Sequence, residues 1–148
     1  MIACSFFGPG VRFHHVGLAV ESIRSVSPES EPRVEHAQKV SLAFISLDGV
    51  TLELLEPFGD DSPILRNLRA GVKLLHLCFE VPDLDAAVAA GKAAGFHRIS
   101  RPVETEVFPG RRVVWVHNAH YGLIELLEGD PAGRRHGDPS TELGAGPQ

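Results

Sequence analysis

Short, mostly apolar runs bounded by glycine, proline or aspartate recur along the chain, and this pattern is typical of β-strands. Turn residues separate several of them, since Asp48-Gly49 predicts a hairpin and Pro109-Gly110 predicts a second turn. The pattern therefore predicts a protein built largely from a sheet. We predict strands over Phe13–Val20, Val40–Leu47, Thr51–Glu56, Leu74–Val81, Phe96–Ser100, Arg111–His117 and Leu123–Glu128.

One segment has the residue spacing of an amphipathic helix. Asp83 precedes it and is a suitable N-cap, and Gly95 suits the position just after the helix. A shorter helix is predicted between Ser62-Pro63, read as N-cap and first helical residue, and Gly71. The apolar positions of the longer helix are Leu84, Ala87, Val88, Gly91 and Ala94.

The segment Glu21–Lys39 lacks such a pattern. It contains two prolines and four serines, with few apolar residues in phase. We predict a loop or a shortened helix here, which would leave an adjoining cleft more open than a long helix would.

The chain repeats the order histidine then glutamate. The runs FHHVGLAV and LLHLCFEV each carry a histidine in third position, His15 or His76. The runs TLELLEP and LIELLEG each carry a glutamate inside a leucine-rich strand, Glu53 or Glu125. We therefore predict two copies of one module. In the second copy, where every element can be predicted, the order is βαβββ.

Length and composition fit a single α+β domain over residues 1–148, with modules at about 12–57 and 74–128. Residues 130–148 are polar and rich in glycine and proline, which predicts a flexible tail. The formal charge of −5 argues against nucleic acid as a partner, and no apolar run is long enough to span a membrane. Two cysteines and no recognisable signal peptide predict a cytoplasmic protein.

The repeated histidines and glutamates form a candidate metal site. Alternation along a strand places each of the four on the face away from its strand's most apolar side. A glutamate buried among leucines is costly unless it is paired or bound to a metal. Two imidazoles and two carboxylates suit one divalent Zn, Ni, Co, Mn or Fe ion. His14 is expected to face the opposite way and to be structural or on the surface, and the histidines outside the repeat are assigned no role.

These residues resemble the vicinal oxygen chelate superfamily, which includes glyoxalases, bleomycin resistance proteins and dioxygenases. The strings HHVGLAV, LELLEPFGDDSPI, LHLCFEV and LIELLE are most similar to methylmalonyl-CoA epimerase-like proteins. The resemblance implies two βαβββ modules that form a cupped, eight-stranded mixed sheet, here with the first helix shortened. It also implies metal ligands at His15, Glu53, His76 and Glu125, and a homodimer.

The resemblance further implies an isomerase or epimerase that moves a proton α to a carbonyl through a metal-stabilised enolate. The substrate would be an acyl thioester of CoA or a carrier protein, or an oxo-acid. Glu125 is the first choice as catalytic base and Glu53 the second. Epimerisation also needs an acid on the opposite face of the carbon, and only the proximity of loops suggests Glu35, Glu104 or Glu106 for that role.

Other functions fit the same resemblance. The ligand order also resembles glyoxalase I, a lyase, whereas in an extradiol dioxygenase a fourth protein ligand would occupy the position that O₂ needs. A drug-sequestering resistance protein of the same fold needs no metal and usually has an aromatic cleft. The presence of all four ligand types, with Trp115 as the single tryptophan, favours an enzyme.

Overall fold

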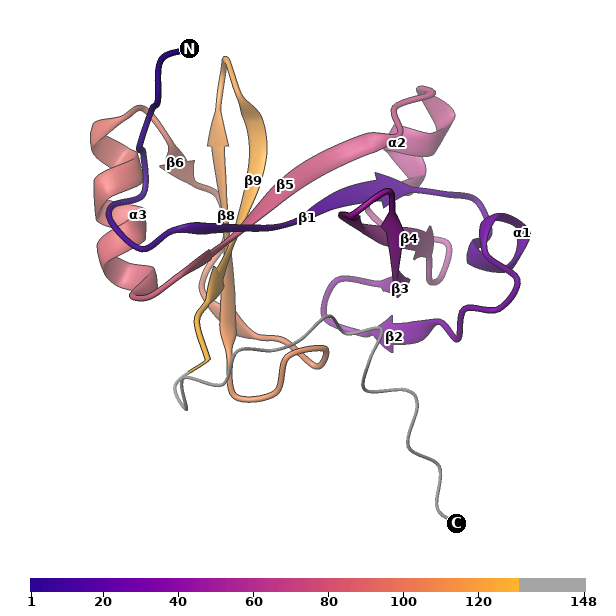
Figure 1. Cartoon of the computed structure of the whole chain (residues 1–148). Helices are drawn as coiled ribbons and strands as arrows, with labels where there is room; N and C mark the ends of the chain where they lie inside the picture. The colour runs from indigo at the N-terminus through magenta and orange to yellow at the C-terminus, as the bar shows by residue number, and fades with distance from the viewer. Residues whose placement is uncertain (131–148) are drawn as a thin grey trace.

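The structure, a computed structural model, describes residues 1–130 (Figure 1). Apart from Asp130, the predicted flexible tail lies outside these described residues. Among the helices of the described part, none is long and apolar enough to cross a membrane.

All strands of the described part belong to one mixed sheet with nine members, in the order β2-β3-β4-β1-β5-β9-β8-β6, with β7 also paired to β8. The predicted number was eight, and the ninth arises because β6 and β7 both pair with β8. The elements are β1 (Arg12–Ala19), α1 (Ile23–Val26), β2 (Arg33–Glu35), β3 (Val40–Leu47), β4 (Val50–Pro57), α2 (Leu65–Arg69), β5 (Leu74–Val81), α3 (Leu84–Ala93), β6 (His97–Arg98), β7 (Val103–Glu104), β8 (Arg112–Asn118) and β9 (Gly122–Glu128).

The two predicted modules are visible in the strand pairing. In the first, β1 runs parallel to β4, and β4 pairs antiparallel with β3. In the second, β5 runs parallel to β9, and β9 pairs antiparallel with β8. An antiparallel pair of β1 and β5 joins the two halves at the middle of the sheet (Figure 1). The inner strands of both modules therefore meet along this one seam.

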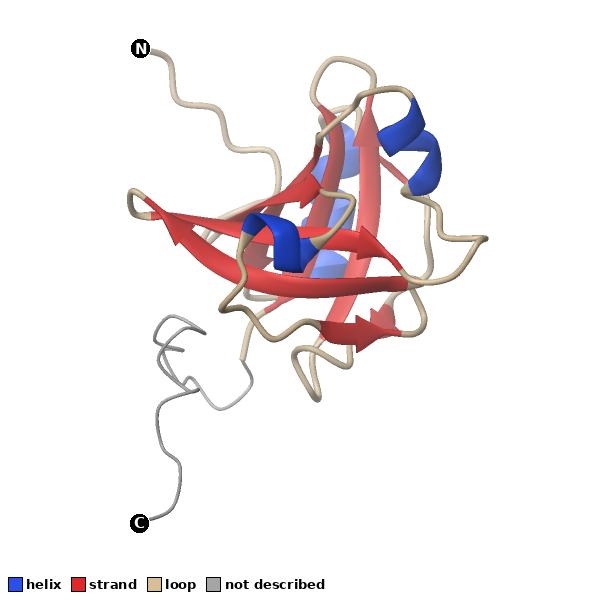
Figure 2. Ribbon diagram, turned by 90° about the vertical axis from the view of Figure 1, so that its right-hand side faces the viewer, coloured by secondary structure: helices blue, strands red, loops and turns tan. Residues whose placement is uncertain are grey.

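Helix α3 covers the second half of the sheet, where it contacts β6, β8 and β9 (Figure 2). Asp83 caps it as predicted, because its Oδ1 accepts a hydrogen bond of 2.9 Å from the Ala86 N–H. Gly95 follows the helix with φ +88°, a conformation that favours glycine. The main core lies beneath α3 and includes Phe7, Val81, Leu84, Ala87, Phe96, Val114, Val116, Ile124 and Leu126.

The first half carries only the one-turn helix α1 in the corresponding place. This agrees with the shortened helix predicted within Glu21–Lys39, although the same segment also forms the short strand β2, which was not predicted. Ile23 of α1 is buried against Ala43 and Leu54. A single turn covers far less of the sheet than the ten residues of α3.

The predicted start of α2 is wrong. Ile64, not Ser62, is its N-cap, and no side chain caps the helix. The Ser62 carbonyl instead accepts a hydrogen bond from the Leu65 N–H in the preceding turn. The helix ends before Gly71, as predicted.

We expect the amides of α1 to exchange with solvent deuterium faster than those of α3. A four-residue helix has one turn of hydrogen bonds and opens locally at low free energy, whereas α3 packs on the main core. Hydrogen exchange measured by NMR or mass spectrometry checks this. Equal, strong protection of both helices would contradict it.

Candidate metal centre

The structure brings together the four residues that the sequence analysis selected. The Nε2 atoms of His15 and His76 lie 3.2 Å apart. The Glu53 Oε2 atom lies 3.0 Å from Nε2 of His15 and 3.4 Å from Nε2 of His76. The Glu125 Oε2 atom lies 3.3 Å from Nε2 of His76 and 4.0 Å from Nε2 of His15. All four residues are buried, and His15 is fully enclosed.

Strand register explains why the four side chains meet. Cys78 on β5 is paired with His15 on one side and with Glu125 on the other. Gly17 on β1 is likewise paired with His76 on one side and with Glu53 on the other. Each row thus holds one histidine and one glutamate, separated by a small residue.

The small residue at position 17 is a steric requirement. A Cβ added to Gly17 would lie 2.1 Å from Cε1 of the His76 ring, far inside van der Waals contact. The His76 ring can therefore lie against the backbone of Gly17 only because this position carries no side chain.

The donor set and its spacing fit one divalent cation. Two ligands bound at about 2.0–2.2 Å stand roughly 3–4 Å apart around a single ion. The four ligand atoms all lie within 4.8 Å of one another, and the contacts given above are 3.0–4.0 Å. Two imidazoles and two carboxylates, without a thiolate, are ligands that borderline divalent metals accept.

Hydrogen bonds within the cluster shift the pKa values of Glu53 and His76, and both shifts favour positive charge beside the carboxylates. Burial alone would raise the pKa of Glu53, but hydrogen bonds from His15 and His76 lower it to about 2. Burial alone would lower the pKa of His76, but hydrogen bonds to Glu125 and Glu53 raise it to about 9. Without a metal, the proton on the His76 imidazole therefore supplies positive charge beside the carboxylates.

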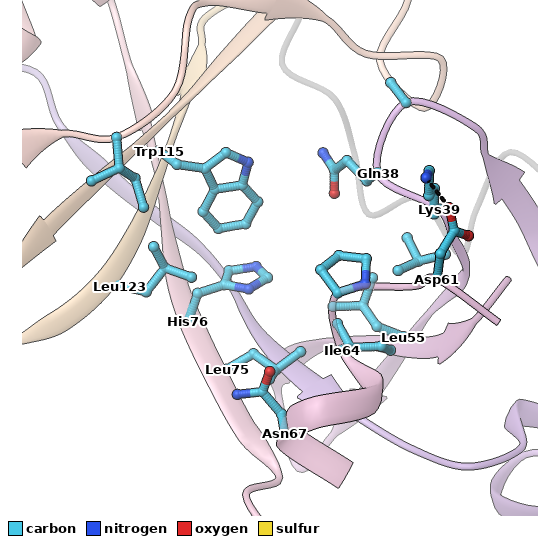
Figure 3. Close-up of a pocket in the computed structure, with 14 residues that line it drawn as sticks. Gln38, Lys39, Leu55, Asp61, Ile64, Asn67, Leu75, His76, Trp115 and Leu123 are labelled. Atoms are coloured by element: carbon cyan, nitrogen blue, oxygen red, sulfur yellow. Dashed lines mark hydrogen bonds and ion pairs between the residues drawn. The ribbon is translucent and has the colours of Figure 1, made fainter. Parts of the chain in front are cut away.

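A cavity of about 500 Å³ opens beside the cluster, between the two halves of the molecule (Figure 3). His76 and Trp115 form one wall, and their rings meet edge to face with centroids 4.7 Å apart. Gln38 and the ion pair of Lys39 with Asp61 lie on the opposite wall. Most of the other lining residues are apolar: Ala37, Val40, Leu55, Pro63, Ile64, Leu75, Ile99 and Leu123, together with the amide of Asn67.

Two aromatic residues beside the cluster were not selected from the sequence as site residues. Trp115 pairs with Glu125 in the β8–β9 ladder and packs on His76. Phe44 pairs with Glu53 in the β3–β4 ladder and packs on His15, with centroids 5.4 Å apart. The predicted Asp48-Gly49 hairpin already implies the pairing of Phe44 with Glu53, so that signal was present in the sequence.

The orientation expected for His14 is wrong. A register shift between Phe13 and His15 interrupts the alternation of β1, so His14 does not face away from its neighbour. Its Nδ1 lies 2.8 Å from Nδ1 of His15, and its ring is half-buried. Burial, followed by the charge of His15, lowers the pKa of His14 to about 4.

The three glutamates considered for a second acid lie in different surroundings. The Glu35 carboxylate is buried and accepts hydrogen bonds from the Thr105 hydroxyl and the Glu106 N–H. The Glu106 side chain is exposed and pairs with His36 at 3.3 Å. Glu104 is exposed on β7. The partners recorded for Glu35 and Glu106 belong to the β2 and β7 region and not to the four-residue cluster.

Comparison with known proteins identifies the family. A model of the glyoxalase/bleomycin resistance protein/dioxygenase superfamily matches residues 14–115. The chain belongs to this superfamily. Mitochondrial methylmalonyl-CoA epimerase from Homo sapiens is 32% identical over 131 residues, which cover 78% of this chain and 72% of the relative. The ethylmalonyl-CoA/methylmalonyl-CoA epimerase of Cereibacter sphaeroides is 28% identical over 130 residues, covering 78% and 96% of the two chains.

A solved superfamily structure supports the same assignment. A methylmalonyl-CoA epimerase in complex with methylmalonyl-CoA and NH₄⁺ matches with a TM-score of 0.64 and 25% identity. The match covers 82% of this chain and 96% of that protein. The comparisons confirm the predicted superfamily, the glyoxalase fold and the class of enzyme, an epimerase or isomerase. The described part of the chain holds a group of four buried residues, His15, Glu53, His76 and Glu125, that could bind a metal ion.

Metal binding is expected to release a proton. A pKa of about 9 keeps His76 protonated near pH 7 in the metal-free protein, whereas a ligand must be neutral. Zinc affinity should therefore rise as the pH increases toward about 9, with close to one proton released per ion near pH 7. Calorimetric titration in buffers of different ionisation enthalpy measures the release, with His36→Ala as control. Affinity that does not depend on pH would contradict the expectation.

Replacement of Gly17 by alanine should weaken metal binding by displacing a ligand. The new Cβ would displace the His76 ring, and we expect metal affinity to fall at least about tenfold. Gly129→Ala is the control, because Gly129 also has a close neighbour, the Val81 carbonyl, but one outside the cluster. Titration with cobalt checks both variants. Unchanged affinity in Gly17→Ala would show that metal binding does not require the His76 ring in its present position.

Proposed function

We propose that this protein is a metal-dependent epimerase that removes and returns the proton α to the carbonyl of a 2-substituted acyl-CoA thioester. The observation that carries the proposal is the convergence of two buried histidines and two buried glutamates beside a largely apolar cavity. The superfamily relatives named above act on methylmalonyl-CoA and ethylmalonyl-CoA. We therefore propose a CoA thioester as the substrate. A thioester of a carrier protein is the alternative substrate.

In this proposal His15, Glu53, His76 and Glu125 hold one divalent cation. When bound, the cation would offset negative charge that develops on the substrate carbonyl oxygen as the α proton leaves. Zn, Ni, Co, Mn and Fe(II) all accept this donor set, so the proposal leaves the choice among them open.

Glu125 is the base that takes the α proton, and Glu53 is the second candidate. Glu53 contacts both imidazoles at 3.4 Å or less, whereas Glu125 contacts only His76 that closely. Glu125 thus has fewer close contacts to the imidazoles than Glu53. This supports Glu125 as the base, because a base must leave its resting partner to accept the substrate proton. Trp115 pairs with Glu125 across the β8–β9 ladder, and its ring both lines the cavity and covers His76. It would therefore help to exclude water from the reacting carbon.

The cavity supports an acyl substrate. Its lining is mainly aliphatic, and the Lys39 ammonium in that lining is paired with Asp61. The aliphatic wall suits the 2-substituent and the thioester arm, while the amides of Gln38 and Asn67 can bind amide groups of that arm. The homodimer and the cytoplasmic location inferred from the sequence belong to the same proposal.

A glyoxalase I type lyase is the second candidate, because its ligand order is the one present in this cluster. The two activities share proton transfer next to a carbonyl but differ in substrate, a thioester or a hemithioacetal of a thiol. Activity assays with both substrate classes distinguish them.

Proton exchange in deuterated water tests the proposal. The metal-loaded enzyme should introduce deuterium at C2 of methylmalonyl-CoA or of a related 2-methyl, 2-hydroxy or 2-oxo thioester, as mass spectrometry would show. Glu125→Gln should lose about 10²-fold or more of the exchange rate, because a positioned base contributes about that much. Metal binding should suffer less, since the glutamine oxygen remains a possible ligand.

Glu128→Gln is the matched control on the same strand, where Glu128 instead pairs with Arg112. Exchange without net racemisation would show that a single base operates. No exchange with any thioester, or a full rate in Glu125→Gln, would contradict the proposed function or the proposed base, respectively.

A further inference from the structure

We infer that His14 is a positioning residue that fixes the tautomer and orientation of the neighbouring ligand His15. The inference rests on the proposed metal site but concerns a residue outside the four ligands. The contact that carries it is the 2.8 Å distance between the two Nδ1 atoms.

The protons of the two rings follow from this contact. If Nε2 of His15 binds a cation, the proton of its neutral ring must lie on Nδ1. His15 is fully buried, so that N–H needs an acceptor, and the acceptor recorded for it in the described part of the chain is His14. Nδ1 of His14 must then hold a lone pair, which places the proton of His14 on its Nε2.

The register shift in β1 makes the contact possible. Adjacent residues of a regular strand point to opposite faces, and their rings cannot meet in this way. Between Phe13 and His15 the pairing with β5 skips one residue, and His14 occupies that position. The bulge thus brings a second imidazole behind the first.

Aromatic rings hold His14 in place. Its ring meets Phe108 edge to face with centroids 5.4 Å apart, and Phe44 at 6.4 Å. Phe44 also packs on His15, so one ring supports both imidazoles. Metal-bound histidines commonly donate their second N–H to a carboxylate or carbonyl, and here a neutral imidazole would take that role. With a neutral acceptor, His15 would be a weaker electron donor than with a carboxylate acceptor, and a cation bound to it would be a stronger Lewis acid.

A second metal site at His14, His15 and Cys78 is the competing interpretation of the same group. The 2.8 Å separation is a hydrogen-bond distance and is shorter than the roughly 3.3 Å between two nitrogens on a tetrahedral zinc ion. Burial also raises the pKa of the Cys78 thiol well above its usual value, which disfavours a thiolate ligand. The geometry therefore indicates a hydrogen bond at this position.

Two substitutions of similar shape test the inference. Asparagine can place an oxygen near the position of Nδ1 and accept the hydrogen bond, whereas leucine cannot. Titration with Co²⁺ alone, followed by visible absorption, should show affinity about 10–100-fold lower for His14→Leu and close to wild type for His14→Asn. His97→Leu, a change of an exposed histidine on β6, should leave binding unchanged.

Nitrogen NMR of the wild-type protein gives a second readout that needs no variant. In the zinc-loaded protein, His15 should carry its proton on Nδ1 and His14 on Nε2. The reverse assignment, two cobalt ions per chain, or equal affinity of His14→Leu and wild type would overturn the inference. If wild-type protein bound no cobalt, the proposed metal site itself would fail, which is a different result.

Discussion

Two buried glutamates impose the electrostatic constraint on which the centre of this fold depends. Burying the carboxylates of Glu53 and Glu125 among apolar strands is costly unless a charged or hydrogen-bonding partner lies beside each of them. The structure meets that need with two imidazoles, both within 3.4 Å of a carboxylate oxygen. A divalent cation would meet it more completely, because it would bind all four groups at once. The cluster would therefore destabilise a sheet with a purely structural role, whereas it suits a sheet that binds a metal.

The two-module architecture supplies this arrangement through an approximate twofold symmetry of strand rows. One row contains His15, Cys78, Glu125 and Trp115, and the other contains His76, Gly17, Glu53 and Phe44. Each aromatic ring packs on the histidine of the opposite row. Both rows cross the β1–β5 pair, and ring contacts join one row to the other. Substitutions in these two strands would therefore alter metal binding and the cavity wall together.

Much of this centre can be predicted from the sequence, because period-two alternation and a repeated order of residues determine which side chains share a face. The repeat alone selects His15, Glu53, His76 and Glu125, and they converge because the first strands of the two copies pair edge to edge. The predicted helix that Asp83 caps is equally local, since its N-cap and the glycine after it act within one turn.

The remaining features depend on pairing between distant segments. The bulge that turns His14 toward His15 comes from the β1–β5 register and leaves no mark in the local pattern. Strands β2 and β7 contain three and two residues, too few for any periodicity, and form because longer neighbours offer hydrogen bonds. The hydrogen bond that buried Glu35 accepts likewise comes from a residue far along the chain, Thr105.

Anomalous X-ray diffraction from crystals of the cobalt-loaded protein tests the central claim most directly, because it locates the ion among named atoms. The account predicts one strong peak per chain, about 2.0–2.2 Å from Nε2 of His15 and of His76 and from an oxygen of Glu53 and of Glu125. Absence of a peak from this cluster, or a peak only at exposed groups such as His36 and Glu106, would contradict it.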